Sequence, residues 1–406
     1  MLFGLAFAPA RHRLRDVVRG RQLIAATATL PAPSVAPPLP ATPRPRHPAA
    51  PREAWLDLAR GVAVVLMVLA HVVDAWTRDG DRGRPAYHGA AYAAGLAAPA
   101  FLFLAGIGTA MAARSRTRRG LPPPAVARAL VVRGGTIFGL AFVFRLQALV
   151  LGLGHPIDVL KVDILNVMGP ALVAAAAVWH VGGRDGVRAV LAAALTAALA
   201  FATPFAFRAA WIEGLPPPLQ WYLRPSPGHG HFTLLPWTAF VLAGLSAGVA
   251  IAAAAGRRER VVQGALLALA AGVGVAAAWA SYQPSIYPPG VSSYWDASPA
   301  FFFVRLALVA ALVPLAWLLT DLVPGPLRRM LTTLGAASLF VYWVHVELVY
   351  GGVAILIKHR VPLELTLPGT LAVAYGLSRL VPVVEAWVAA PAGRPEPVRR
   401  LVARLL

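Results

Sequence analysis

From residue 54 onward, apolar runs long enough to cross a lipid bilayer dominate the chain. A transmembrane helix needs about 20 mostly apolar residues, and it satisfies its own backbone polar groups where no water is present. Hydrophobic residues make up 58% of the 406 residues and charged residues only 13%, which is not typical of a soluble domain. We therefore predict an all-α integral membrane protein, a polytopic bundle of about ten transmembrane helices. The candidate spans are 54–76, 91–113, 129–152, 163–181, 187–207, 232–255, 261–282, 299–320, 333–356 and 366–390.

Basic residues are distributed unevenly between these spans. With a cytoplasmic N-terminus, 24 of the 37 Lys and Arg residues fall in inner segments and 8 in outer segments. Because positively charged segments stay in the cytoplasm, we predict a multi-pass protein of the inner (plasma) membrane with both termini cytoplasmic. The net charge of +20 then reflects topology. We expect contact with the lipid bilayer and no nucleic-acid partner.

The chain divides into three parts. Residues 1–53 are Arg- and Pro-rich without an apolar period, and we predict a disordered cytoplasmic extension there. Residues 54–390 form the transmembrane domain, and residues 391–406 form a basic cytoplasmic tail. The absence of Cys excludes disulfides, thiolate metal sites and a Cys nucleophile, and we predict no metal.

Four ionisable residues share one face of the first span: Asp57, Arg60, His71 and Asp74. The eleven-residue step from Arg60 to His71 is almost three helical turns, or about 16 Å along the axis. Asp57 lies one turn before Arg60, and Asp74 lies one turn after His71, on the same face. Ionisable groups in a membrane helix are costly and usually face the protein interior or a wet cavity. The stripe therefore predicts a functional site.

His71 is the candidate general base, because an imidazole with an oriented tautomer can take a proton from an attacking hydroxyl or amine. Asp74 is placed to orient that ring. The alternative is a histidine that only packs between helices. A second imidazole, His345 in the ninth predicted span, could face the first, and His88, just before the second span, is a rival base.

Arginines near the predicted cytoplasmic side are candidates for binding a phosphorylated donor. Arg60 presents a planar fork suited to phosphate, with Asp57 beside it; alternatively, the two form a pair that only neutralises itself. Arg114, Arg116 and Arg118 follow the second span and could bind the phosphates of a nucleotide-bearing donor. They could equally be an ordinary cytoplasmic stop signal.

The outer segments 208–231 and 283–298 are Pro-rich and carry Trp and Tyr. These aromatic residues are typical of an interfacial belt. They could also form a platform on which sugar rings stack.

The segment WLDLARGVAVVLMVLAH resembles the opening helix of the transmembrane acyltransferase superfamily. Later segments, from AAPAFLFLAGIGTAM through VVRGGTIFGLAFVF, VDILNVMGPALV and FTLLPWTAFVLAGLSAG to LGAASLFVYWVHVELVYG, occur in the order typical of one branch. That branch is the heparan-α-glucosaminide N-acetyltransferase catalytic-domain family, which is related to the acyltransferase-3 branch. The resemblance covers about residues 52–356.

The resemblance implies that residues 54–390 transfer an acetyl group from cytosolic acetyl-CoA to an acceptor on the far side of the membrane. The acceptor of the lysosomal member is a terminal glucosamine. By position, His88 matches that member's catalytic histidine, but the spacing to Pro99 is shorter and a neighbouring Trp is missing. The position of His71 holds an Asn there and a His in many bacterial relatives. We therefore rank His71 before His88.

The leading hypothesis is a membrane-bound, acyl-CoA-dependent O- or N-acetyltransferase that modifies a glycan or lipid-linked acceptor of the cell envelope. The alternative is a proton-coupled transporter or flippase of envelope precursors, in which the intramembrane charges couple substrate movement to protons. A third is a membrane scaffold with a degenerate site. The sequence sets neither the acyl chain length nor the oligomeric state, and a homodimer is compatible with it.

Overall fold

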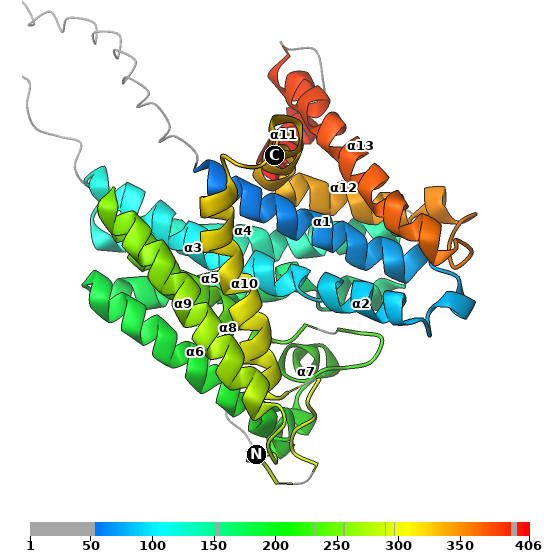
Figure 1. Ribbon diagram of the computed structural model, residues 1–406. Coiled ribbons are helices and arrows are strands. Elements are labelled where there is room, and N and C mark those ends of the chain that lie inside the picture. The colour runs from blue at the N-terminus through cyan, green and yellow to red at the C-terminus, as the bar shows by residue number, and fades with distance from the viewer. Residues whose placement is uncertain are drawn as a thin grey trace, which may run out of the picture. The chain divides into compact units, whose positions relative to one another are not determined.

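The computed structural model describes residues 53–150, 155–230, 232–254, 256–288, 290–295, 297–390 and 396–406. The predicted extension, residues 1–53, lies outside these ranges except for its last residue. Within them the chain is helical and forms no β-ladder, only two isolated bridges (Figure 1). The protein is therefore an all-α polytopic membrane protein, as predicted.

Fourteen α-helices are described along the chain. They are α1 (Ala54–Trp76), α2 (Pro85–Ala94), α3 (Ala97–Arg118), α4 (Pro123–Val150), α5 (Ile164–Val181), α6 (Asp185–Phe207), α7 (Pro217–Leu223), α8 (Leu234–Ala253), α9 (Arg257–Ala280), α10 (Pro299–Leu319), α11 (Gly325–Ala336), α12 (Ser338–Tyr350), α13 (Leu363–Ala389) and α14 (Glu396–Leu405). In the described part of the chain, nine helical segments are long and apolar enough to span a membrane, and a bent pair would make ten.

The bent pair corrects the predicted span 333–356. The chain turns by 91° between α11 and α12, so this stretch is not one continuous helix. The end of α11 is pressed against α1: a Cβ on Gly335 would lie 1.9 Å from the carbonyl oxygen of Asp57. This close approach fixes α11 against α1, while α12 turns away toward the site described below.

Helix α1 belongs to two hydrophobic clusters. Its first half, including Leu58 and Ala63, packs with α3, α5, α8 and α10. Its second half, including Val68 and Val72, packs with α12 and α13. Helix α1 therefore joins the two halves of the core.

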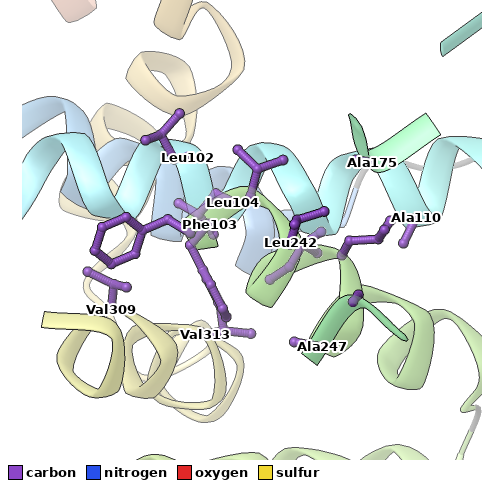
Figure 2. Close-up of a cluster of buried hydrophobic side chains, with 14 of the residues drawn as sticks. Leu102, Phe103, Leu104, Ala110, Ala175, Leu242, Ala247, Val309 and Val313 are labelled. Carbon is purple, nitrogen blue, oxygen red and sulfur yellow. The ribbon is translucent and has the colours of Figure 1, made fainter. Parts of the chain in front are cut away.

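Glycines let other helices approach one another closely. Cβ atoms on Gly106 of α3 and Gly244 of α8 would meet the facing backbone at 2.1 and 1.9 Å. Figure 2 shows the surrounding side chains, with Phe103 of α3 near Val309 and Val313 of α10. Small residues at these positions give the backbone contact on which membrane helix packing depends.

The C-terminal end of α1 is tied to the chain before α13. The amides of His359 and Val361 donate to the carbonyls of Ala75 and Trp76, and the amide of Arg78 donates back to Val361. These three backbone hydrogen bonds form a strap across the end of the helix that carries the predicted stripe.

Asp81 holds the neighbouring loop to the start of α13. Its carboxylate accepts hydrogen bonds from Nε of Arg78 at 2.8 Å and from the amide of Leu363 at 3.0 Å. These two bonds, together with the charge of Arg78 and a contact with Arg84, lower the pKa of Asp81 from 3.8 to about 2.

Candidate functional site

One face of α1 lines a cavity of about 1200 Å³. Arg60, Met67, His71 and Asp74 all contribute to its wall, so the predicted shared face is confirmed for Arg60, His71 and Asp74. The other walls come from α2, α3, α4, α5, α8, α10, α11 and α12, and the last two residues of the chain also contribute. Residues from most of the long helices therefore meet around this one cavity.

Asp57 contacts the cavity wall indirectly, through Arg60. Its side chain does not line the wall but forms an ion pair with Arg60 at 3.2 Å, and the residue is only 7% exposed. The Arg60 guanidinium also lies against Gly108 of α3, where a Cβ would come within 2.9 Å of it. Asp57 and Gly108 therefore set where the Arg60 charge sits.

His71 is bonded to a second histidine. Its Nδ1 lies 2.7 Å from Nε2 of His345, and the ring centroids are 4.8 Å apart. The expectation that a second imidazole faces the first is confirmed. His345 is fully buried, so its position is set by packing.

The tautomers of the pair follow from hydrogen-bond donors and acceptors. Nδ1 of His345 lies 2.8 Å from the carbonyl oxygen of Val341, which can only accept, so this nitrogen carries a proton. With both rings neutral, Nε2 of His345 accepts from Nδ1–H of His71. Nε2 of His71 then keeps its lone pair and can accept a proton.

Asp74 has a different partner from the one expected. Its Oδ2 accepts a hydrogen bond from the hydroxyl of Tyr350 at 2.8 Å, while His345 occupies the Nδ1 side of His71. The Tyr350 ring meets the His71 ring edge-on, with centroids 5.6 Å apart. Tyr350, which sequence reasoning missed, thus links Asp74 to the histidine pair.

The predicted donor-binding arginines after the second span do not line the cavity. Arg114 forms an ion pair with Asp185 of α6. Arg116 and Arg118 donate to the carbonyls of Ala112 and Ala252. Arg114 and Arg118 therefore bond to neighbouring helices, and Arg116 bonds within its own helix.

Arg133 of α4 lines the cavity together with Arg60. Among the described residues, no hydrogen bond or ion pair involves Arg133, and its nearest charges are those of Arg60 and Arg116. The sequence signal was an ionisable residue inside an apolar span. Arg133 is therefore one of four arginines in the cavity wall, with Arg60, Arg145 and Arg305.

His88 of α2 lies outside this cavity. It is exposed and lines a smaller recess of about 630 Å³ that shares Ala91, Gly95 and Arg305 with the main cavity. The structure thus places the two candidate bases on different but adjoining walls. Within the described residues, no cluster of three or more His, Asp or Glu side chains is arranged to hold a metal.

A further ion pair closes another part of the cavity wall. Asp163 caps the start of α5 by accepting from the amides of Leu165 and Asn166, at 2.9 and 3.2 Å. Nε of Arg145 on α4 lies 3.5 Å from the same carboxylate. The charge of Arg145 is therefore matched within the protein.

Membrane-length helices around a cavity lined by a bonded histidine and by arginines define a polytopic membrane protein with polar groups in its interior. Residues 52–280, more than half of the chain, match the family model of the heparan-α-glucosaminide N-acetyltransferase catalytic domain, and the chain belongs to this acetyltransferase family. The match covers α1 to α9, so His345 lies beyond it. A comparison with curated proteins finds no match.

Proposed function

We propose that this protein transfers an acetyl group from cytosolic acetyl-CoA, or another acyl-CoA, to a glycan or lipid-linked acceptor at the outer face of the membrane. The observation that carries the proposal is a single cavity lined by both Arg60 and His71. They lie about 16 Å apart along α1, which is close to the length of the phosphopantetheine arm of coenzyme A. Membership of the acetyltransferase family supports the same reaction.

Arg60 and Arg133 bind the phosphates of the donor in this proposal. Two neighbouring guanidinium groups repel each other, and a phosphate group between them would remove that repulsion while accepting several N–H donors. Asp57 holds Arg60 in place. Arg114, Arg116 and Arg118, at the C-terminal end of α3, then act in topology and helix packing.

His71 acts as the general base. The acceptor's hydroxyl or amine attacks the thioester carbonyl carbon, Nε2 of His71 takes the proton, and the carbon–sulfur bond breaks. The proton returns to the leaving thiolate, which restores the neutral ring. His345 is a positioning residue, because its acceptor nitrogen keeps the proton of His71 on Nδ1.

A second route through an acyl-imidazole on His71 or His88 has the same overall balance. In that route the imidazole displaces the thiolate first, and the acceptor then displaces the imidazole. Incubation with labelled acetyl-CoA in the absence of acceptor separates the two routes, because only the second leaves label on the protein.

Purified protein in detergent tests the proposal directly. We expect acetyl-CoA to be consumed with amino sugars or sugar alcohols as acceptors, and the product to gain one acetyl group. His71→Ala should lower the rate by about 10²–10⁴-fold while coenzyme A still binds. Normal turnover in His71→Ala with none in His88→Ala would assign the base to His88, and normal turnover in both would refute the mechanism.

In the proposed orientation the protein lies in the inner membrane and both of its termini are in the cytoplasm. The donor then reaches the Arg60 end of the cavity, and the acceptor reaches the end near Asp74. This arrangement connects the family's chemistry with modification of the cell envelope.

A further inference from the structure

The recess beside the main cavity is walled by aromatic side chains and one cation. His88, Tyr92, Leu96, Trp295, Phe301 and Arg305 line it. Arg305 also lines the main cavity, so its side chain stands where the two spaces meet. It lies in the second turn of α10, near the end that the proposed topology places at the outer face.

Arg305 lacks an acidic partner among the described residues. Its one hydrogen bond to a described residue is weak, 3.4 Å to the carbonyl of Gly95, and its Nε is buried without a hydrogen bond. Its remaining contacts are aromatic, with the guanidinium carbon 4.9 Å from the ring centre of Trp237 and 5.0 Å from that of Phe301.

Two other arginines of the cavity wall show what Arg305 lacks. Arg60 is paired with Asp57, and Arg145 with Asp163. Cation–π contacts hold a guanidinium in place, but they leave most of its N–H donors unused. A guanidinium at membrane depth with unused N–H donors is costly unless a ligand accepts hydrogen bonds from them.

We propose that Arg305 binds an anionic group, a carboxylate or a phosphate, on the sugar acceptor, an inference that rests on the proposed function. The planar fork of Arg305 donates paired hydrogen bonds to the oxygens of either anion. The rings of Trp237, Trp295 and Phe301 provide flat apolar walls for the sugar beside it. The acceptor that this site prefers is therefore an acidic or phosphorylated sugar.

Matched monosaccharides test this on the full-length protein in detergent, with binding measured by calorimetry. The probes are methyl glucoside, methyl glucuronide and glucose 6-phosphate, which present a neutral group, a carboxylate and a phosphate on similar rings. Hydrogen bonds to a charged group predict that at least one anionic probe binds about tenfold to a hundredfold more tightly than the neutral one. A preference for the carboxylate indicates a uronic-acid acceptor, and a preference for the phosphate indicates a phosphorylated one.

Arg305→Gln should remove the preference for the anion and leave binding of methyl glucoside unchanged. Arg305→Lys should restore it in part, because charge returns without the fork. The matched control is Arg208→Gln, which removes an exposed arginine that lies outside both the cavity and the recess. Equal binding of all three probes to the unaltered protein would overturn the proposal without any variant, as would a full preference in folded Arg305→Gln.

Acetyl transfer is followed in parallel with glucosamine and glucosamine 6-phosphate as acceptors. Binding of anions through Arg305 without any acetyl transfer would refute the proposed function and leave the anion site standing. Transfer to both acceptors at equal efficiency, with no effect of Arg305→Gln, would refute the anion site and leave the proposed function standing.

Discussion

At the scale of single residues, the contact between His71 and His345 determines which nitrogen can take a proton. His345→Leu leaves the Nδ1–H of His71 without its acceptor, and a buried donor without a partner costs about 1–3 kcal/mol. We expect the ring to flip or change tautomer, and kcat to fall by about tenfold or more. His345→Gln, whose amide oxygen can accept the same proton, should retain more of the activity.

The pH profile of kcat separates this positioning role from a structural one. An altered imidazole environment shifts the profile, whereas a loss of folded protein lowers it uniformly. Unchanged kcat and an unchanged profile in His345→Leu would remove His345 from the mechanism.

The proposed phosphate-binding arginines, Arg60 and Arg133, give a second prediction. Arg60→Ala and Arg133→Ala should each weaken binding of coenzyme A by about tenfold or more, because each loses hydrogen bonds to a charged phosphate. Arg60→Lys should recover part of the affinity. Calorimetric titration with coenzyme A measures this. Arg118→Ala is the comparison: a loss as large as that of Arg133→Ala would place the arginines at the C-terminal end of α3 in the donor site.

Sequence and structure agree where a helix alone fixes the geometry. Arg60 and His71 share a face because their spacing is close to three turns, and this holds for any helix of that sequence. The partner of Asp74 could not be predicted in the same way. Tyr350 lies 276 residues further along the chain, and only the packing of α12 against α1 brings the two together. The sequence showed Arg133 as a charge in an apolar span, but it did not show that Arg133 lines the same cavity as Arg60.

At the scale of helices, contacts made through glycine hold α1 in place. Gly335→Ala adds a methyl group 1.9 Å from a backbone oxygen of α1, so the helices must separate. Overpacking of this kind costs about 1–3 kcal/mol. We expect a lower melting temperature in detergent and a lower rate of acetyl transfer.

Gly264 of α9 provides the matched control, because a Cβ there meets no atom within 4 Å. Gly264→Ala should be tolerated or slightly stabilising, since alanine favours a helix over glycine. Equal melting temperatures of the two variants would contradict the close contact between α1 and α11.

The positions of the spans were predictable because length and hydropathy alone define them. The 91° bend between α11 and α12 was not, because the apolar pattern continues through it without Pro. The bend lies next to the close approach of Gly335 to α1, a tertiary contact that the apolar pattern does not show. The same holds for α7, a short helix inside a segment that the sequence indicated only as a Pro-rich loop.

At the scale of the whole molecule, orientation in the membrane is directly testable. Reporter fusions after Gly120 and after Gly290 should report the cytoplasm and the outer side respectively, as the distribution of basic residues predicts. Both fusions on one side would contradict the proposed topology, and with it the separate entry of donor and acceptor.

Stability should depend on pH through Asp81. Because its pKa is lowered from 3.8 to about 2 in the folded protein, its contribution is present above about pH 4 and is lost as the pH falls toward 2. Asp81→Asn should lower the melting temperature at pH 6 and reduce its decrease between pH 5 and pH 3. Asp79→Asn, at an exposed side chain two residues away, is the control. The same pH response in Asp81→Asn and the unaltered protein would exclude this carboxylate as the cause.

The strap at residues 359–361 and the Gly335 contact hold α1 near both of its ends. A helix restrained in this way slides or rotates against α11 and the segment before α13 only if one of these contacts breaks, so His71 keeps its position relative to them. A transporter in which α1 moved against these elements would have to break one of these attachments in every cycle. In a protein with a stationary histidine, only the reacting molecules and single side chains need to move, and an acyl group could cross the bilayer while the helices stay where they are.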